Sequence, residues 1–450
     1  MLVNVSKDNH PVRPIRFVVV MLCACVLSPQ VFGQETKEAY ELAQNKQTLA
    51  LKRLNNPLLK PEIVLGFKAI ERDYRNILRG GTNGRNEKEL DILRRGIEYR
   101  IFTLSDSDIQ ADSRRFGIAN QTLQRELAGA GNPAQMPNPQ QRQQFRELVY
   151  TEAMKLFKTM LNEGNFLARS AAVQRLLDLE AVPKRGQARL KMFADVHLVY
   201  LSILRDPKQP DSIKAITASA IRVYLQKADA VSTVELQFAE AILSELARPN
   251  LSAAYQISLL QALEEIRVPR RVSGKKEPLI ICGMANLMTD QTADIQVRCR
   301  AARVMGRCGW DRQIKYNVLA WAVADLTTET ALLFNQAKNK NDPKWGRCGW
   351  SLYTAFHHEG RQEVQGKGPG PLPKGFLNRD PASTVVRDAY ANGVPVMAHL
   401  MFNNNAVGAR IVGPLFGWAN KNRPKSLIYD PSCPAFPVKQ PAGGAAQQGG

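Results

Sequence analysis

The sequence predicts an all-α chain, in which an α-solenoid of stacked helix hairpins lies between an N-terminal helical region and an irregular C-terminal extension. Apolar residues recur at spacings of three and four, as in Leu90, Leu93, Ile97 and Ile101, which is the period of an amphipathic helix. Similar helix pairs also recur between residues 142 and 310, and such internal repetition is typical of helical-repeat architectures.

The composition bounds the class of protein. The chain has 450 residues, of which 44% are apolar and 23% charged, an ordinary globular composition that excludes collagen-like, wholly disordered and polytopic membrane proteins. Lys and Arg number 61 against 41 Asp and Glu, a formal net charge of +20. This excess favours anionic partners or surfaces.

Residues 1–33 have the pattern of an export signal. Lys7, Arg13 and Arg16 precede an apolar run of about 11 residues, too short to span a membrane, and Gly33 follows at a cleavable position. We therefore expect a periplasmic, cell-envelope or secreted protein, whose net charge falls from +20 to +18 when three basic residues and Asp8 are removed.

A second interpretation of the same segment is a lipid anchor. Leu22-Cys23-Ala24-Cys25 resembles a lipoprotein signal box, which would place an acyl chain on Cys25. Only in that case do we expect an association with a membrane, because no later stretch approaches the length of a spanning helix.

Export would place the cysteines in an oxidising compartment, where disulfides form. Five cysteines follow the signal, and an odd number leaves at least one thiol unpaired or bonded between chains. Either the helical cysteines are small buried apolar side chains, or one intramolecular bridge forms. The candidates for a bridge are Cys282, Cys299, Cys308 and Cys348.

The chain before the repeats divides into two parts. Residues 34–128 carry helical periodicity, and we expect an N-terminal helical domain there. Residues 129–141 are rich in Pro, Gly and Gln, which predicts a linker.

About four repeats follow, over residues 142–310. An aliphatic and a basic residue open the second helix of a pair, and small residues follow four and five positions later, as at Thr217-Ala218 and Ala301-Ala302. A hairpin cannot bury its own apolar face, so we expect stacked hairpins that share a continuous core. The equivalent positions are Ala168-Arg169, offset slightly from the others, and Ile213-Lys214, Tyr255-Gln256 and Val297-Arg298, which are 42 residues apart.

The best copy resembles the HEAT repeat family. Its residues are Leu287-Met288-Thr289-Asp290, then Val297-Arg298, then Ala301-Ala302. The resemblance implies a right-handed superhelix of helix pairs, in which Asp290 and Arg298 link adjacent repeats. Asp206 stands seven residues before Ile213, as Asp290 does before Val297, whereas the copy at Tyr255 lacks both the Asp and the Arg.

The pattern weakens after residue 310. We expect a degenerate helical and irregular region over 311–430, including a Gly/Pro-rich excursion at 360–381, and a disordered low-complexity tail over 431–450. Whether 311–430 completes the solenoid or forms a separate unit stays open.

The sequence offers no spacing typical of catalysis. His358-Glu359 begins like a zinc-protease helix, but Gln362 stands where the second His is needed. The glycines around Lys367 do not have the spacing of a phosphate-binding loop. Glu264-Glu265 is interpreted as part of a solvated helix face. We therefore nominate no catalytic residue, no cofactor and no metal ligand.

The basic residues after the first and third repeats are the candidate site. Equivalent loops of a solenoid fall along one edge, so these residues would form a positive rim for an anionic partner. The rim comprises Lys184, Arg185, Arg189, Lys191, Arg267, Arg270, Arg271, Lys275 and Lys276.

Three functional hypotheses follow. The first is an exported, non-enzymatic scaffold that binds a protein or an anionic envelope polymer, because extended repeat surfaces suit that role. The second is an enzyme or metal-binding protein with a site in 340–430, using His357, His358 or His399. The third is nucleic-acid binding on the rim, which export and the scarcity of interleaved aromatic residues disfavour.

Overall fold

The computed structural model describes residues 58–82, 86–180, 192–271, 276–309, 311–357 and 375–436. Regular structure in these ranges is helical, apart from isolated bridge residues such as the antiparallel pair Glu180 and Met192. The all-α prediction is therefore confirmed. None of the helices in these ranges is both long and apolar enough to cross a membrane. The expected export signal and Cys25 lie outside the described residues.

The N-terminal helices pack as a small bundle under the first repeat. They are α3 (Pro61–Arg79), α4 (Glu87–Phe102), α5 (Ser107–Ala111) and α6 (Ser113–Ala128), with a short 3-10 turn at Thr103–Ser105. Gly80 ends α3 with a φ of 94°, a left-handed conformation that favours glycine. The buried Tyr74 hydroxyl donates to Glu126 across the bundle (3.0 Å).

The segment expected to be a linker, 129–141, is instead packed. Ala130 is fully buried and Met136 nearly so. The backbone N–H groups of Gly131 and Asn132 donate to the last carbonyls of α3, and Arg146 donates to the carbonyl of Ala130 (2.9 Å). Because these contacts satisfy backbone groups at both ends, the segment joins the N-terminal bundle to the repeats as a fixed turn.

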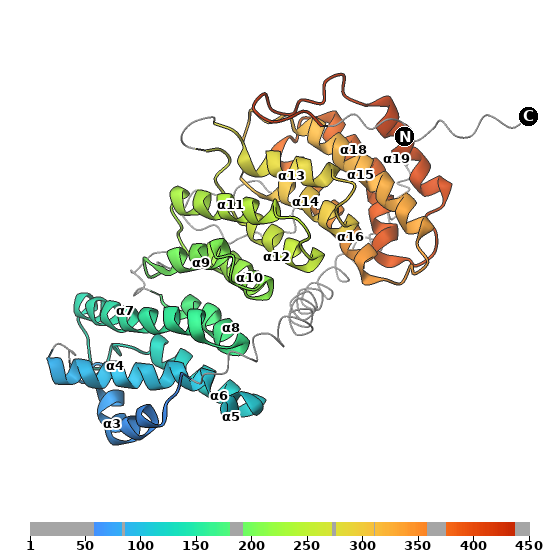
Figure 1. Ribbon diagram of the computed structural model, residues 1–450. Coiled ribbons are helices and arrows are strands. Elements are labelled where there is room, and N and C mark those ends of the chain that lie inside the picture. The colour runs from blue at the N-terminus through green and yellow to red at the C-terminus, as the bar shows by residue number, and fades with distance from the viewer. Residues whose placement is uncertain are drawn as a thin grey trace, which may run out of the picture.

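Four helix pairs follow, where the sequence predicts repeats (Figure 1). The pairs are α7 (Pro139–Glu163) with α8 (Phe166–Arg175), α9 (Val196–Arg205) with α10 (Asp211–Lys227), α11 (Ser232–Leu246) with α12 (Ala253–Leu263), and α13 (Leu279–Thr289) with α14 (Ile295–Arg307). A 3-10 turn, Leu176–Asp178, extends α8.

The second helices of the pairs form one row, in which α8 packs on α10, α10 on α12 and α12 on α14. The equivalent residues Ile213, Tyr255 and Val297 are all buried within it. So are the residues four, five and eight positions later in each copy, including Ala301 and Ala302. The expected repeat positions therefore coincide with the core, including those of the copy at Tyr255.

Residues 311–436 are more regular than expected. They form α15 (Tyr316–Gln336), α16 (Pro343–Phe356), α17 (Phe376–Arg379), α18 (Thr384–Phe402) and α19 (Ala409–Lys421). α16 packs on α14 and α18 packs on α16, so the second-helix row comprises α8, α10, α12, α14, α16 and α18. α15 and α19 pack against each other and against α18, as Figure 1 shows at the far end of the chain.

The expectation of a disordered tail from residue 431 is wrong for 431–436. Cys433 is bonded to Cys282, and the backbone N–H of Phe436 donates to the carbonyl of Leu427 (3.2 Å). The buried ring of Phe436 also packs on that of Tyr429, with 4.9 Å between centroids. The disulfide and the buried ring of Phe436 hold this segment in place, although its composition is typical of a disordered tail. The remainder, 437–450, lies outside the described residues.

Candidate anionic-partner surface

The described part of the basic rim lies in the loop between α12 and α13. It includes Arg267, Arg270, Arg271 and Lys276. The other expected members fall outside the described residues: Lys184, Arg185, Arg189, Lys191 and Lys275.

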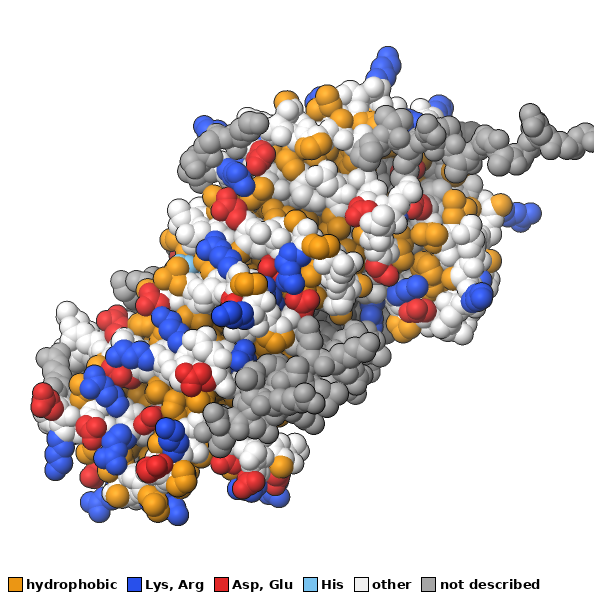
Figure 2. Space-filling model, in the orientation of Figure 1, with side chains coloured by type: hydrophobic (Ala, Val, Ile, Leu, Met, Phe, Trp, Pro, Cys, Tyr) orange, Lys and Arg blue, Asp and Glu red, His pale blue; other side chains and the backbone are white. Residues whose placement is uncertain are grey.

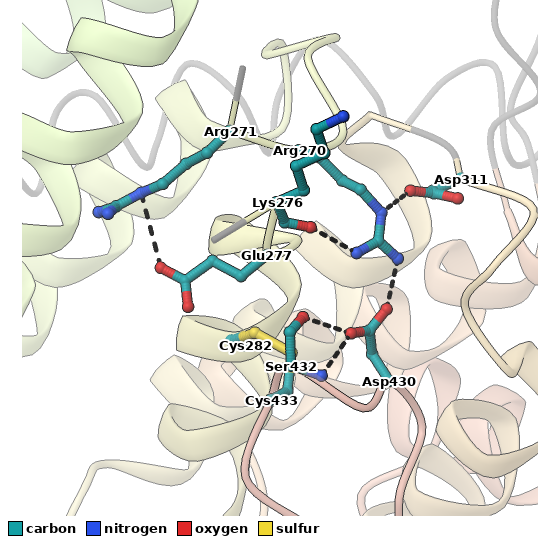
Figure 3. Close-up of a disulfide and its surroundings, with 9 residues drawn as sticks. All are labelled: Arg270, Arg271, Lys276, Glu277, Cys282, Asp311, Asp430, Ser432 and Cys433. Atoms are coloured by element: carbon teal, nitrogen blue, oxygen red, sulfur yellow. Dashed lines mark hydrogen bonds and ion pairs between the residues drawn. A yellow bond between two sulfur atoms is a disulfide. The ribbon is translucent and has the colours of Figure 1, made fainter. Parts of the chain in front are cut away.

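Arg270 is the centre of a polar clamp, shown in Figure 3. Its guanidinium donates to the carboxylates of Asp311 and Asp430 and to the backbone carbonyl of Lys276. Its side chain is only 16% exposed. Although burial raises the pKa of Asp430, hydrogen bonds from Arg270 and Ser432 outweigh it and lower that pKa. Arg270 therefore binds parts of this chain together.

Arg267 is held in a similar way by α11. Its Nε donates to Oε1 of Glu235 (2.8 Å), and its backbone N–H donates to Oε2 (2.7 Å). The backbone N–H of Val268 donates to the same oxygen (3.1 Å). The Glu235 side chain is 3% exposed, so this carboxylate anchors the loop from inside.

Arg271 and Lys276 are the more accessible members of the loop. Arg271 is 38% exposed and lies 3.5 Å from carboxylate oxygens of both Glu240 and Glu277. Lys276 is exposed. One acid of the loop and four acids of neighbouring segments thus lie beside these four bases and offset their positive charge. The acids are Glu235, Glu240, Glu277, Asp311 and Asp430.

The surface view agrees with this local balance. On the face drawn in Figure 2, Lys and Arg side chains are interspersed with Asp and Glu side chains. Opposite charges that alternate over a surface weaken its attraction for a polyanion. The net charge of the sequence is therefore not gathered into one patch on this face.

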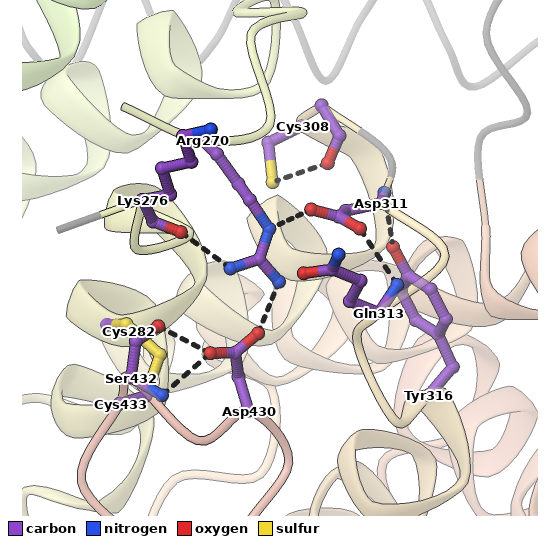
Figure 4. Close-up of polar contacts among 11 residues, drawn as sticks. Arg270, Lys276, Cys282, Cys308, Asp311, Gln313, Tyr316, Asp430, Ser432 and Cys433 are labelled. Carbon is purple, nitrogen blue, oxygen red and sulfur yellow. Dashed lines mark hydrogen bonds and ion pairs between the residues drawn. A yellow bond between two sulfur atoms is a disulfide. The ribbon is translucent and has the colours of Figure 1, made fainter. Parts of the chain in front are cut away.

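A disulfide lies beside the clamp and fixes the segment that carries Asp430. Cys282 of α13 is bonded to Cys433, with Cα atoms 5.4 Å apart, and Ser432 next to it donates to Asp430 (Figure 4). Of the four cysteines expected as candidates for a bridge, only Cys282 is bonded, and its partner lies in the segment expected to be a disordered tail. The other three, Cys299, Cys308 and Cys348, are free and buried.

The sequence Gly-Arg-Cys-Gly-Trp occurs twice, at 306–310 and at 346–350, but the two copies do not form a paired site. Cys308 directly follows α14, whereas Cys348 lies inside α16. Burial raises the pKa of the Cys308 thiol to about 11, so little thiolate is present at neutral pH. The two copies occupy different local structures, consistent with a chance similarity.

A buried charge cluster beneath the loop escaped the sequence reasoning. Glu264 at the end of α12 is 1% exposed, not on a solvated face. It lies 2.7 Å from Nε of Arg300 and 3.1 Å from Nε of Arg303, and Arg307 is also close. Burial alone would raise the pKa of Glu264, but the surrounding arginines lower it to about 2.

A sequence signal for this cluster does exist. Arg300, Arg303 and Arg307 are spaced by three and four residues, which places them on one face of α14. Because α14 packs against several other helices, a row of arginines on one of its faces predicts a buried carboxylate on a neighbouring helix, since an unpaired buried charge is costly. Glu264, the residue that directly follows α12, carries this carboxylate.

In three of the four pairs, a basic residue near the start of the second helix forms a link between repeats. Arg298 donates from both terminal nitrogens to Glu329 of α15 (2.7 and 2.9 Å) and from Nε to the carbonyl of Met288 (2.9 Å). Lys214 donates to Glu245 of α11 (3.0 Å). Each link therefore reaches from a second helix to the first helix of the following pair.

The first copy uses the same position with a different acceptor. Arg169 is buried, and its Nη1 donates to the side chain of Gln209 (3.1 Å) in the turn before α10. Its Nε and Nη2 donate to the carbonyls of Gly164 and Asn162, which end α7. In three of the four copies, a basic residue therefore bonds to the following helix pair. The acceptor is an amide in the first copy and a carboxylate in the other two.

The aspartates of the repeat turns act more locally than the resemblance implies. Oδ1 of Asp206 accepts from the backbone N–H of Lys208 (2.8 Å), and Oδ1 of Asp290 accepts from that of Thr292 (2.9 Å). Both contacts close the turn within one helix pair. Hydrogen bonds from the hydroxyl and the backbone N–H of Thr292 lower the pKa of Asp290.

The histidines of the C-terminal region have distinct environments. His399 is buried, and its Nε2 is 2.8 Å from the carbonyl of Asn405, a structural contact. His357 is exposed and stacks on Tyr353 and Tyr390. His358 lies outside the described residues. Within the part of the chain that is described, no three His, Cys, Asp or Glu side chains are grouped to hold a metal ion.

The stacked rings extend over two helices of the second-helix row. Trp350 and Tyr353 lie on α16, His357 directly follows this helix at the same spacing of three to four residues, and Tyr390 belongs to α18. Neighbouring centroids are 5.5–6.2 Å apart with small interplanar angles. We call these four residues the aromatic ladder. Its rings are half-buried or exposed, which leaves part of their surface accessible.

Comparison with known proteins finds no matching family model, no matching curated protein and no matching solved structure. The resemblance to HEAT repeats therefore stays a prediction from the residues that carry it.

Proposed function

We propose that this chain is an exported, non-enzymatic scaffold built as an α-solenoid of HEAT-like pairs, which binds a protein or an anionic component of the cell envelope. The observation that carries the proposal is the unbroken second-helix row from α8 to α18. Such a row gives an extended surface with many side chains available to one partner.

Buried links support a rigid scaffold. Arg169, Lys214 and Arg298 are each at most 6% exposed and each bond across a repeat boundary. A surface that is already ordered loses little conformational freedom when it binds. The links therefore favour recognition by a preformed face over folding upon binding.

The aromatic ladder is the part of the row best suited to a protein partner. Trp and Tyr dominate the binding energy of protein interfaces, since they bury large areas at a low entropic cost. The described rim is less suited to an anionic polymer, because Arg267 and Arg270 are committed to internal carboxylates. We therefore favour a protein partner held at the ladder, with a polyanion at the rim as the alternative.

The test is capture of a partner from envelope extract by purified 34–450. The Trp350→Ala/His357→Ala variant truncates the ladder. Phe402→Ala/Phe416→Ala is the matched control, because it removes two rings that are 61% and 54% exposed elsewhere. We expect the ladder variant to lose at least tenfold of the captured partner and the control to retain it. Circular dichroism melting of each variant verifies that it is folded.

A third variant separates the two partner classes. Arg271→Gln/Lys276→Gln removes the accessible charges of the rim, and Arg410→Gln/Lys421→Gln removes the same charge from exposed positions on α19. Loss of capture in the rim variant alone, together with steep dependence on salt, would assign binding to a polyanion at the rim. Equal capture by every variant would reject both surfaces.

A further inference from the structure

Two of the three free cysteines lie together between neighbouring helices of the row. Cys299 of α14 and Cys348 of α16 are neighbours across the contact between these helices, and both side chains are wholly buried. The hydroxyl oxygen of Thr330 lies 3.6 Å from the Cys299 sulfur. The pair is distinct from the Cys282–Cys433 bond and takes no part in the proposed binding surface.

The packing of α14 on α16 independently explains this juxtaposition. Gly306 lies directly against the backbone of Ala355, where a Cβ atom would collide with the Ala355 carbonyl. Cys299 precedes Gly306 by seven residues, and Cys348 precedes Ala355 by seven. Seven residues are about two helical turns, so both cysteines lie on the contacting faces of two parallel helices. The close approach leaves room for only short side chains between them.

The third free cysteine does not compete for this pairing. Cys308 lies nine residues after Cys299, beyond the end of α14. Its thiol is directed to the carbonyl of Gly309, and Arg379 lies beside it. The geometry therefore singles out one pair among the three thiols.

We propose that Cys299 and Cys348 form a second disulfide, joining α14 to α16, when the chain folds in the presence of a small-molecule disulfide such as oxidised glutathione. One cysteine thiolate attacks the oxidant, which forms a mixed disulfide and releases one glutathione thiolate. The other cysteine thiolate attacks the cysteine sulfur of the mixed disulfide and releases the second. The two protons lost by the cysteines end on two molecules of glutathione, and the oxidant takes up both electrons.

The oxidation must precede closure of the helix interface. In the folded chain both sulfurs are shielded from a bulky oxidant. The hydrogen bond from Cys299 and burial also raise the pKa of Cys348 well above its ordinary value, which suppresses the reactive thiolate. Protein folded in a reducing compartment therefore keeps both thiols, whereas protein folded with the oxidant acquires the bond.

In the test, reduced Cys308→Ser protein is refolded in a glutathione redox buffer. The remaining thiols are then blocked in denaturant, and the chain is cleaved on the N-terminal side of Asp residues without reduction. In this variant the peptide 294–310 contains Cys299 alone and 342–379 contains Cys348 alone. We expect the two peptides to be linked, with a mass about 2 Da below the sum of their thiol forms because two hydrogens are lost. The Cys282–Cys433 link is the internal control, and the buffer is chosen so that this link is complete. Recovery of 294–310 and 342–379 as separate blocked peptides would then overturn the proposal.

A second readout excludes scrambling during digestion. In Cys282→Ser/Cys433→Ser protein folded with the oxidant, we expect dithiothreitol to lower the urea midpoint. The same protein with Cys348→Ser added should show no such shift. An equal response of the two proteins to the reductant would also contradict the proposal.

Discussion

The repeats between α8 and α14 and the region after α14 are held together by different means. In the repeats, the links join neighbours in sequence, as when Lys214 reaches Glu245, 31 residues away. In the C-terminal region, Asp430 accepts from Arg270, which lies 160 residues earlier, and Trp321 donates to the carbonyl of Ala419 across 98 residues. The comparison shows that neighbouring helix pairs are joined by contacts between residues close in sequence. The C-terminal region, in contrast, is held by contacts between segments far apart in sequence.

The largest effect should come from the buried centre of the repeats. Glu264→Gln leaves Arg300 and Arg303 without their carboxylate, so we expect the free energy of unfolding to fall by about 3–5 kcal/mol. Urea denaturation measures it. Glu265→Gln, the adjacent and partly exposed acid, is the control and should cost clearly less. Equal losses in the free energy of unfolding would show that the buried Glu264 stabilises the fold no more than the partly exposed Glu265.

The same residue should set the acid sensitivity of the repeats. The pKa of Glu264 is lowered from 4.5 to about 2 in the folded chain. Its contribution is therefore present above pH 4.5 and is lost as the pH falls towards 2, by about 3 kcal/mol in total. Unfolding curves of parent and Glu264→Gln between pH 5 and 2 should converge. Parallel curves would mean that Glu264 is not the titrating group.

The next largest loss of stability should come from removing the disulfide that fixes the C-terminal region. Cys282→Ser removes a bond that spans 151 residues, and we expect a loss of about 2–4 kcal/mol. The matched variant Cys308→Ser replaces a buried free thiol and should change stability less. Urea midpoints with and without reductant distinguish the two, because only the parent and Cys308→Ser should respond to reduction of this bond.

Arg270 should act on the same segment as the disulfide. Arg270→Gln removes charged hydrogen bonds to Asp311 and Asp430, and we expect a loss of about 2 kcal/mol. Combined with Cys433→Ser, the loss should be non-additive, because both contacts hold residues 427–436. Strict additivity in the double-mutant cycle would mean that the clamp and the disulfide act independently.

The smallest effect should come from the repeat that departs from the pattern. The copy at Tyr255 lacks the basic residue, but the Tyr255 hydroxyl donates to Glu245 (2.8 Å), the acceptor also used by Lys214. Tyr255→Phe should cost about 1 kcal/mol. Tyr99→Phe, a partly exposed tyrosine of the N-terminal bundle, is the control for loss of a hydroxyl. An unchanged urea midpoint would show that Glu245 is satisfied without Tyr255.

The sequence predicts the helical class and the repeat core, because both depend on local periodicity. Ile213, Tyr255 and Val297 are found buried where their spacing places them. It does not predict that Cys433 pairs with Cys282, since the composition around Cys433 is typical of a tail. The commitment of Arg270 to Asp430 is equally hidden, because a basic run looks the same whether its counter-charges are solvent ions or distant carboxylates.

Hydrogen exchange measured with and without reductant tests the difference between the two regions most directly. We expect reduction of Cys282–Cys433 to speed amide exchange in 427–436 and α13, while α8, α10 and α12 keep their protection. Such a result would confirm that the end of the array is fixed separately from its repeats. Uniform loss of protection through α8–α14, or no change in 427–436, would contradict it.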